Sequence, residues 1–142
     1  MRIIDTHQHL WDTNALSYPW LDGFDALSQK YTIADYRKAS AGIDVAATVH
    51  VEANPAPGSE VAEAARLTQL AQENGLVGAI VASAPLEEPN VAEMLRRLCE
   101  YPLVVGVRRM AWHREDPDFY RDPNLIKGVR ALAEYNLTFD LC

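Results

Sequence analysis

The chain has 142 residues, an apolar fraction of 49% and a formal net charge of −7 at neutral pH. This apolar fraction allows a packed core and argues against a disordered chain. The negative charge argues against nucleic acid or an anionic membrane surface as a partner, because both would repel it. No apolar run reaches the length of about 18 residues that a membrane span requires. The length is usual for one domain, so we expect residues 1–142 to form a single domain.

A histidine pair follows the first predicted strand. Arg2-Ile3-Ile4 is a short apolar run typical of a buried strand, and it leads into Asp5-Thr6-His7-Gln8-His9. Alternate side chains of an extended strand share one face, so we expect Asp5, His7 and His9 to point together. Two neutral imidazoles on one face can ligate a divalent metal, and Asp5 could orient one of them or ligate as well. The alternative is that the two histidines only close the strand by hydrogen bonding.

The stretch from Leu10 to Tyr31 has no clean hydrophobic period, which predicts a long loop. Loops of this length inside a compact domain are usually functional. Trp11 is one of several aromatic side chains in the loop. They could wall a pocket for a ring-shaped ligand, or they could simply pack the loop onto the body of the domain. Thr32 then predicts the start of a short helix over Ile33 to Ser40, because threonine is a favoured N-cap.

Strands and helices alternate along the rest of the chain. Apolar and β-branched runs predict strands over residues 45–52, 76–84, 103–110 and 137–141. Capping residues and apolar stripes predict helices over residues 59–74, 89–100 and 122–135. This alternation predicts an α/β fold with a parallel sheet. Two architectures fit it: an open flavodoxin-like sheet, or the N-terminal part of a (β/α)₈ barrel, which typically needs about 250 residues.

Polar side chains lie near the C-terminal ends of these predicted strands, where α/β folds place their sites. Glu52 ends the second strand, and it could ligate a metal, bind a hydroxyl group of a ligand or hold other residues of the site in place. Arg108, in the fourth strand, could clamp a substrate carboxylate or hydroxyl, the alternative being a surface salt bridge. Asp140, in the fifth strand, could take a polar role in the site.

Other polar residues are weaker candidates. His50 lies one pair deeper than Glu52 and is expected to be a core histidine with its hydrogen bonds satisfied. Arg109 has the opposite parity to Arg108 and is expected to be structural, and His113 has no spacing that supports a role. The two cysteines, Cys99 and Cys142, form no C-x-x-C spacing, so we expect reduced thiols that fill the core of a cytoplasmic protein.

Four segments together resemble the amidohydrolase superfamily, and in particular its amidohydrolase 2 branch of L-fuconolactonases and pyrone-dicarboxylate lactonases. They are IIDTHQHLWD at the start, VEANP after the second strand, VVGVRRM in the fourth strand and LAEYNLTFDLC at the end. The resemblance implies a (β/α)₈ barrel nearly twice the length of this chain. It therefore favours the N-terminal part of a barrel, with about five βα strands, over the open sheet.

The resemblance also implies a site. His7 and His9 match the first-strand histidines that ligate a divalent ion, usually zinc, in metal-using relatives. Some lactonases of this branch work without metal and use the pair to polarise the lactone carbonyl. The family also uses a later histidine and a last-strand aspartate as the general base, and neither position occurs within these residues. We therefore expect a partner in the form of a second copy or a missing C-terminal half.

Together with the residues above, this resemblance implies a hydrolase that opens a sugar-acid lactone or a related cyclic ester. We expect His7, His9 and Arg108 to be catalytic, with Glu52, Trp11 and Asp140 contacting a small-molecule substrate. Two alternatives stay open: a metal-dependent decarboxylase of the same superfamily, and a non-catalytic half-barrel module. The sequence lacks a glycine-rich phosphate loop after its first strand, which argues against a nucleotide or flavin as the ligand of such a module.

Overall fold

Five parallel strands alternate with four α-helices in the computed structural model, which describes residues 1–111 and 116–142. The strands are β1 (Arg2–Gln8), β2 (Asp44–Val51), β3 (Val77–Ser83), β4 (Val104–Arg109) and β5 (Thr138–Leu141). The helices are α1 (Ile33–Ala39), α2 (Glu60–Asn74), α3 (Val91–Leu98) and α4 (Pro123–Ala131). Short 3₁₀ helices span Pro19–Leu21, Phe119–Arg121 and Leu132–Tyr135. Every predicted strand and helix is present, with ends displaced by a few residues.

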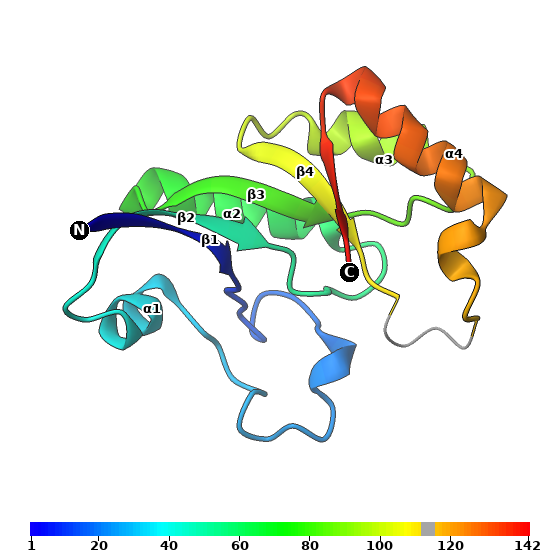
Figure 1. Cartoon of the computed structure of the whole chain (residues 1–142). Coiled ribbons are helices and arrows are strands. Elements are labelled where there is room, and N and C mark those ends of the chain that lie inside the picture. The colour runs from blue at the N-terminus through cyan, green and yellow to red at the C-terminus, as the bar shows by residue number, and fades with distance from the viewer. Residues whose placement is uncertain (112–115) are drawn as a thin grey trace.

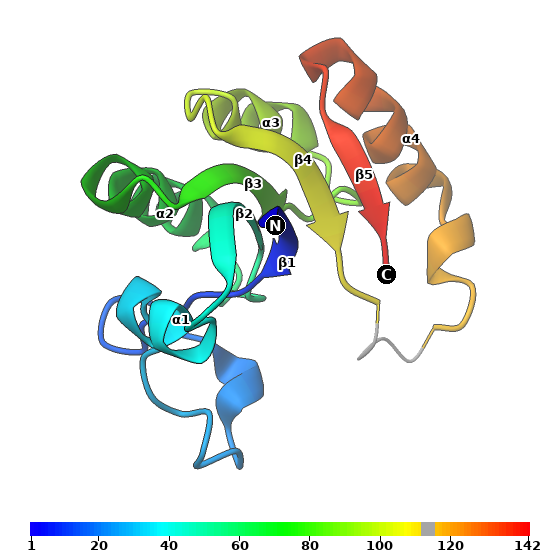
Figure 2. The same cartoon turned by 60° about the vertical axis from the view of Figure 1, so that its left-hand side comes forward.

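The strands follow one another across the sheet in chain order, β1-β2-β3-β4-β5, and every neighbouring pair is parallel. A flavodoxin-like sheet places its second strand outside its first, so the open-sheet alternative is wrong. The sheet instead curls, with α2, α3 and α4 along its outer side (Figures 1 and 2). This is the arrangement of one half of a (β/α)₈ barrel, which confirms the predicted fold class.

The main core lies between the sheet and these helices. Leu67 of α2, Leu95 of α3 and Leu125 of α4 are buried there against Ile80 and other strand residues. Apolar residues at helical spacing form this layer because only one face of each helix can meet the sheet. Gly128 in α4 allows the closest approach, since a Cβ at this position would lie 1.9 Å from the carbonyl oxygen of Leu86.

Strands β1 and β5 each have one strand neighbour among the described residues, so both are edges of the sheet. Ile4 in β1 is 62% exposed and Leu141 in β5 is 71% exposed. Unpaired strand edges and exposed apolar side chains favour association with further strands.

None of the described helices combines the length and the apolar character that crossing a membrane would require.

The two cysteines depart from the sequence-based expectation. Cys99 follows α3 and Cys142 follows β5, and both are exposed and free of disulfide bonds. Cys99 lies outside the core because Leu95 and Leu98 occupy the buried face of α3, and Cys142 lies beyond the end of the edge strand β5. The prediction of unpaired thiols is correct, whereas their placement in the core is wrong.

Candidate functional site

The histidine pair lies at the C-terminal end of β1. The Nε2 atoms of His7 and His9 are 3.1 Å apart. The Nδ1 atom of His9 lies 2.8 Å from the carbonyl oxygen of Val51, which can only accept a hydrogen bond, so Nδ1 carries the proton. Burial lowers the pKa of His9, with the nearby Arg108 and His7 acting in the same direction. His9 is therefore a neutral imidazole whose Nε2 lone pair faces His7.

Asp5 does not share this face, so the predicted grouping of Asp5 with the two histidines is wrong. Asp5 pairs with Thr48 across the sheet and Gln8 pairs with His50, which leaves two residues of β1 opposite one of β2. Such a bulge shifts the alternation of side chains by one. The Asp5 carboxylate instead accepts a hydrogen bond of 2.7 Å from the hydroxyl of Tyr36 in α1.

The histidine pair fits one divalent metal ion. Two nitrogen ligands at about 2.0–2.1 Å from a tetrahedral zinc ion lie roughly 3.3 Å apart, close to the separation of the two Nε2 atoms. The backbone bond from His9 Nδ1 is the kind of second contact that orients a metal-ligating imidazole. Residues 1–111 and 116–142 offer no group of three or more His, Cys, Asp or Glu side chains for a metal, so further ligands would come from elsewhere.

His50 is fully buried behind the pair, with its ring 6.3 Å from that of His9. Its Nδ1 accepts a hydrogen bond of 3.3 Å from the backbone N–H of Leu10. Burial lowers the pKa of His50 to about 3, so it is neutral. It lies in the core, as its depth in the strand predicts. The expectation that its hydrogen bonds are satisfied is wrong for one ring nitrogen, because Nε2 has no hydrogen-bond partner among the described residues.

Arg108 and Glu52 form a buried ion pair at the centre of the sheet. The Nε of Arg108 donates to the Glu52 carboxylate at 2.7 Å, and its Nη2 donates to the Glu52 carbonyl at 2.8 Å. Burial raises the pKa of Glu52, and the Arg108 guanidinium opposes this shift. The two predicted residues thus come together, from β4 and from the end of β2. Because the pair is buried, the surface salt bridge considered for Arg108 does not describe it.

An open hollow of about 380 Å³ lies in front of these groups, within the size range of small-molecule sites. Its polar lining includes His9, Glu52 and Arg108, and much of the remainder is aromatic. Trp11, from the long loop, lines this hollow and also packs against the cluster of Tyr18, Leu21 and Ala53. A ring-shaped ligand at this wall stays a prediction. The hollow is lined by His9, Trp11, Trp20, Phe24, Glu52, Ala53, Asn54, Arg108 and Met110.

The loop is held in this position by hydrogen bonds. Trp11 and Tyr31 form an antiparallel bridge that closes the loop at its base. The indole N–H of Trp11 donates to the carbonyl of Leu27, and that of Trp20 donates to the carbonyl of Ala53 at 2.8 Å. The second bond joins the aromatic wall to the residue that directly follows Glu52.

Asp140 lies beside the site but not in the lining of the hollow. It pairs in register with Arg108, so the two residues share one face of the sheet. Arg109 points elsewhere and forms an ion pair of 2.5 Å with Glu87, which agrees with the structural role expected for it. His113 lies outside the described residues.

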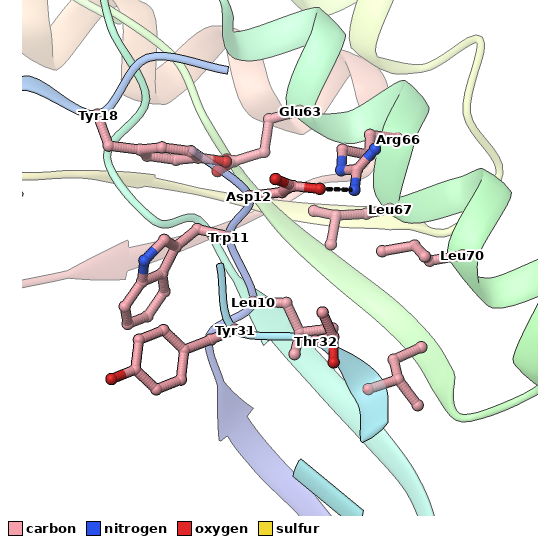
Figure 3. A pocket seen from close by; sticks show the side chains of 11 residues that line it. Leu10, Trp11, Asp12, Tyr18, Tyr31, Thr32, Glu63, Arg66, Leu67 and Leu70 are labelled. Atoms are coloured by element: carbon pink, nitrogen blue, oxygen red, sulfur yellow. Dashed lines mark hydrogen bonds and ion pairs between the residues drawn. The ribbon is translucent and has the colours of Figure 1, made fainter. Parts of the chain in front are cut away.

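A carboxyl group that the sequence did not single out lies close to Glu52: Glu63 of α2, which is 3% exposed. Burial and the neighbouring Glu52 raise the pKa of Glu63 to about 8. Figure 3 shows its carboxyl group facing the hydroxyl of Tyr18, beside an ion pair of 2.6 Å between Asp12 and Arg66. The sequence spacing could have indicated this burial, because Glu63 stands four residues before the buried Leu67 and so lies on the same face of the helix.

Comparison with known proteins gives a consistent result. A family model described as "Amidohydrolase" matches residues 4–142. An uncharacterized protein of Sinorhizobium fredii, y4mH, is 29% identical over 98% of this chain, which covers 52% of that protein. The chain thus spans about half the length of the relative that it matches.

Solved structures agree. An amidohydrolase from Burkholderia multivorans, crystallised with zinc, has a TM-score of 0.77 at 26% identity over 99% of this chain and 49% of that one. A second crystal form of it, with HEPES bound, has a TM-score of 0.79 at 27% identity, over 99% of this chain and 48% of that one. A probable 2-pyrone-4,6-dicarboxylic acid hydrolase from Acinetobacter baumannii has a TM-score of 0.67 over 98% of this chain and 48% of that one. Its identity of 17% shows a shared fold only.

Proposed function

Because the chain belongs to the amidohydrolase family, we propose that it forms the N-terminal half of a hydrolase barrel that opens a sugar-acid lactone or a related cyclic ester. The observation that carries this proposal is the pair of Nε2 atoms of His7 and His9, 3.1 Å apart at the C-terminal end of β1. Active sites of (β/α)₈ barrels lie at this end of the strands. We infer that the pair and the hollow in front of it supply a place for a carbonyl group.

Hydrolysis of a lactone needs activation of the carbonyl, stabilisation of the oxyanion and a base that deprotonates water. In the proposed role, His7 and His9 activate the carbonyl group, and they would be the protein ligands of a zinc ion. Bound there, the metal would polarise the carbonyl and stabilise negative charge on its oxygen. The zinc in the crystals of the B. multivorans relative supports this reading. A metal-free reaction would use the same two imidazoles as direct partners of the carbonyl.

The other residues would bind and orient the substrate. Arg108 uses Nε and one Nη2 N–H on Glu52, so its remaining donors would serve a substrate hydroxyl or carboxylate. Glu52 would hold that guanidinium in place, and Trp11 would cover one face of a sugar ring. Asp140, in register with Arg108, would extend the polar surface. We assign the general base to the part of the barrel that lies beyond these residues.

This function requires the sheet to be closed. The chain matches only about half of each relative, and among its described residues each edge strand has a strand neighbour on one side alone. We propose that a second half of the barrel, or a second copy of this chain, covers these edges. The exposed, unpaired thiols of Cys99 and Cys142 are consistent with a reducing compartment such as the cytoplasm.

The test is an assay of a complete barrel that contains this chain, with sugar lactones and related carboxylic acids as substrates. Ring opening releases a titratable acid, whereas decarboxylation releases carbon dioxide, so the two reactions are distinguished by their products. We expect acid release from a lactone and no carbon dioxide. Carbon dioxide release from a carboxylate without lactone opening would overturn the proposal in favour of the decarboxylase. A chelator added to the same assay shows whether the metal is required.

A further inference from the structure

Two buried carboxyl groups lie close together at the hollow: Glu52, which lines it, and Glu63, which lies behind it. Glu52 has Arg108 as its partner. Glu63 has no lysine or arginine partner among residues 1–111 and 116–142, although it is 3% exposed. A buried carboxyl group without a counter-ion is costly unless it is neutral and hydrogen-bonded. A buried carboxyl group in this position therefore needs an explanation from its contacts.

Glu63 contacts the turn that follows β2. Its Oε1 accepts a hydrogen bond of 3.2 Å from the backbone N–H of Ala53. The carbonyl of the same residue accepts from the Trp20 indole at 2.8 Å. The next residue, Asn54, has a φ of 53°, in the left-handed region that non-glycine residues rarely adopt. Glu63 and Trp20 thus hold the Ala53 peptides from two sides, directly between Glu52 and this unusual turn.

Glu63 also faces the long loop. The hydroxyl of Tyr18 points at its carboxyl group (Figure 3), and this contact, after burial, raises the pKa of Tyr18 above its usual range. Tyr18 is 5% exposed and packs with Leu21 and Ala53 in a small cluster to which Trp11 and Trp20 are joined. One side chain of α2 therefore contacts both structures that form the site: the end of β2 and the aromatic loop.

We propose that Glu63 is a positioning residue, which fixes the Glu52–Arg108 pair through Ala53 and the aromatic wall through Tyr18. This inference rests on the proposed function only in taking the hollow as the site. Glu63 does not line the hollow, so it acts through these neighbours and not on a substrate.

The surroundings of Glu63 make this positioning dependent on pH. Burial and the Glu52 carboxylate favour its neutral form, and the pKa of about 8 places the loss of its proton just above neutrality. An ionised Glu63 would repel Glu52 and gain by moving toward water. The titratable and charged groups around it are Glu52 of β2, Arg108 of β4, Tyr18 and Asp12 of the loop, and Arg66 of α2.

The experiment is a pH titration of a complete barrel that contains this chain, followed by nuclear magnetic resonance with no substrate present. The reporters are the backbone N–H of Ala53, the indole N–H of Trp20 and the Nε–H of Arg108. We expect all three signals to shift together with a midpoint near 8. In Glu63→Gln the amide replaces the protonated carboxyl group, so the signals should keep their neutral-pH positions and lose this titration.

Glu60→Gln is the matched control. Glu60 lies in the first turn of the same helix and is also buried, but it makes no hydrogen bond to Ala53. This variant should titrate as the wild type does. The proposal is overturned if the Ala53 signal shows no shift between pH 6 and 10, if the shift persists in Glu63→Gln, or if Glu60→Gln removes it. Lactone hydrolysis plays no part in this measurement, so its result is separate from that of the proposed function.

Discussion

The side chains of Arg108 and Glu52 meet across β3, with Nε of Arg108 2.7 Å from Oε1 of Glu52. Their side chains are 8% and 1% exposed. Removing one partner leaves the other charge buried without compensation, which typically costs about 3–5 kcal/mol. We therefore expect Arg108→Met to lower the free energy of unfolding by about that amount in a urea titration.

Two further variants separate charge from packing. Arg108→Met combined with Glu52→Gln should recover part of the loss, because the second change removes the uncompensated carboxylate. Arg96→Ala is the control, since Arg96 forms only exposed ion pairs with Glu93 and Glu100, and it should leave stability unchanged within error. Equal stability of Arg108→Met and the wild type would show that the ion pair is not formed.

The contact of α4 with the loop after β3 gives a second prediction. Alanine usually stabilises a helix relative to glycine, but a Cβ on Gly128 would lie 1.9 Å from the backbone oxygen of Leu86. We expect Gly128→Ala to lower the free energy of unfolding by roughly 1–3 kcal/mol, the usual cost of overpacking. Lys127→Ala, at the neighbouring position of the helix, should leave the free energy of unfolding unchanged. A stabilised Gly128→Ala variant would mean that α4 does not pack in this way.

The raised pKa of Glu63 predicts how the free energy of unfolding changes with pH. Its pKa is raised in the folded state from 4.5 to about 8, so the folded chain binds more protons than the unfolded chain between these values. The contribution of Glu63 is thus most favourable below pH 4.5 and falls as the pH rises toward 8. Glutamine does not titrate, so Glu63→Gln should gain stability relative to the wild type over this range, by on the order of a few kcal/mol. Unfolding curves at several pH values measure the difference, and a constant difference would contradict the assignment.

Local sequence patterns were sufficient for the strands and helices, because each apolar run or stripe has its own period and its own capping residues. Thr32, for example, forms the capping box with Asp35 that starts α1. The choice between the two parallel architectures needed the resemblance to a family. The order of strands depends on contacts between distant segments, which no local period encodes.

The site was predictable where it depends on one strand end and less so where it depends on packing. His7 and His9 meet as their spacing indicated. The prediction that Asp5 shares their face was wrong because side chains alternate strictly only in a regular strand. The register shift between Asp5 and Gln8 depends on pairing with β2, which the sequence of β1 does not reveal. Glu63 was missed because a glutamate in the first turn of a helix is usually an exposed charge that favours the helix dipole.

The open edges of β1 and β5 predict that the 142-residue chain does not persist as an active monomer. Ile4 and Leu141 expose apolar side chains there, next to unpaired backbone groups. Size-exclusion chromatography with light scattering should find a species larger than 15.8 kDa, or aggregation, together with no lactone turnover. Adding the remaining strands should restore a defined species. A monodisperse, active monomer would show that the edges need no cover.

The central claim is that His7 and His9 carry the reaction, and steady-state hydrolysis of a sugar lactone by a complete barrel that contains this chain tests it most directly. We expect His7→Ala and His9→Ala each to lower kcat/KM by roughly 100-fold or more, the scale of losing one electrophilic or acid–base contribution. Asp5→Asn is the matched control. The Asp5 carboxylate accepts hydrogen bonds from the Tyr36 hydroxyl and from the backbone N–H of His7, and the asparagine amide oxygen can still accept the second of these, so this variant should retain nearly full activity. Rates near the wild-type value in both histidine variants would contradict the account.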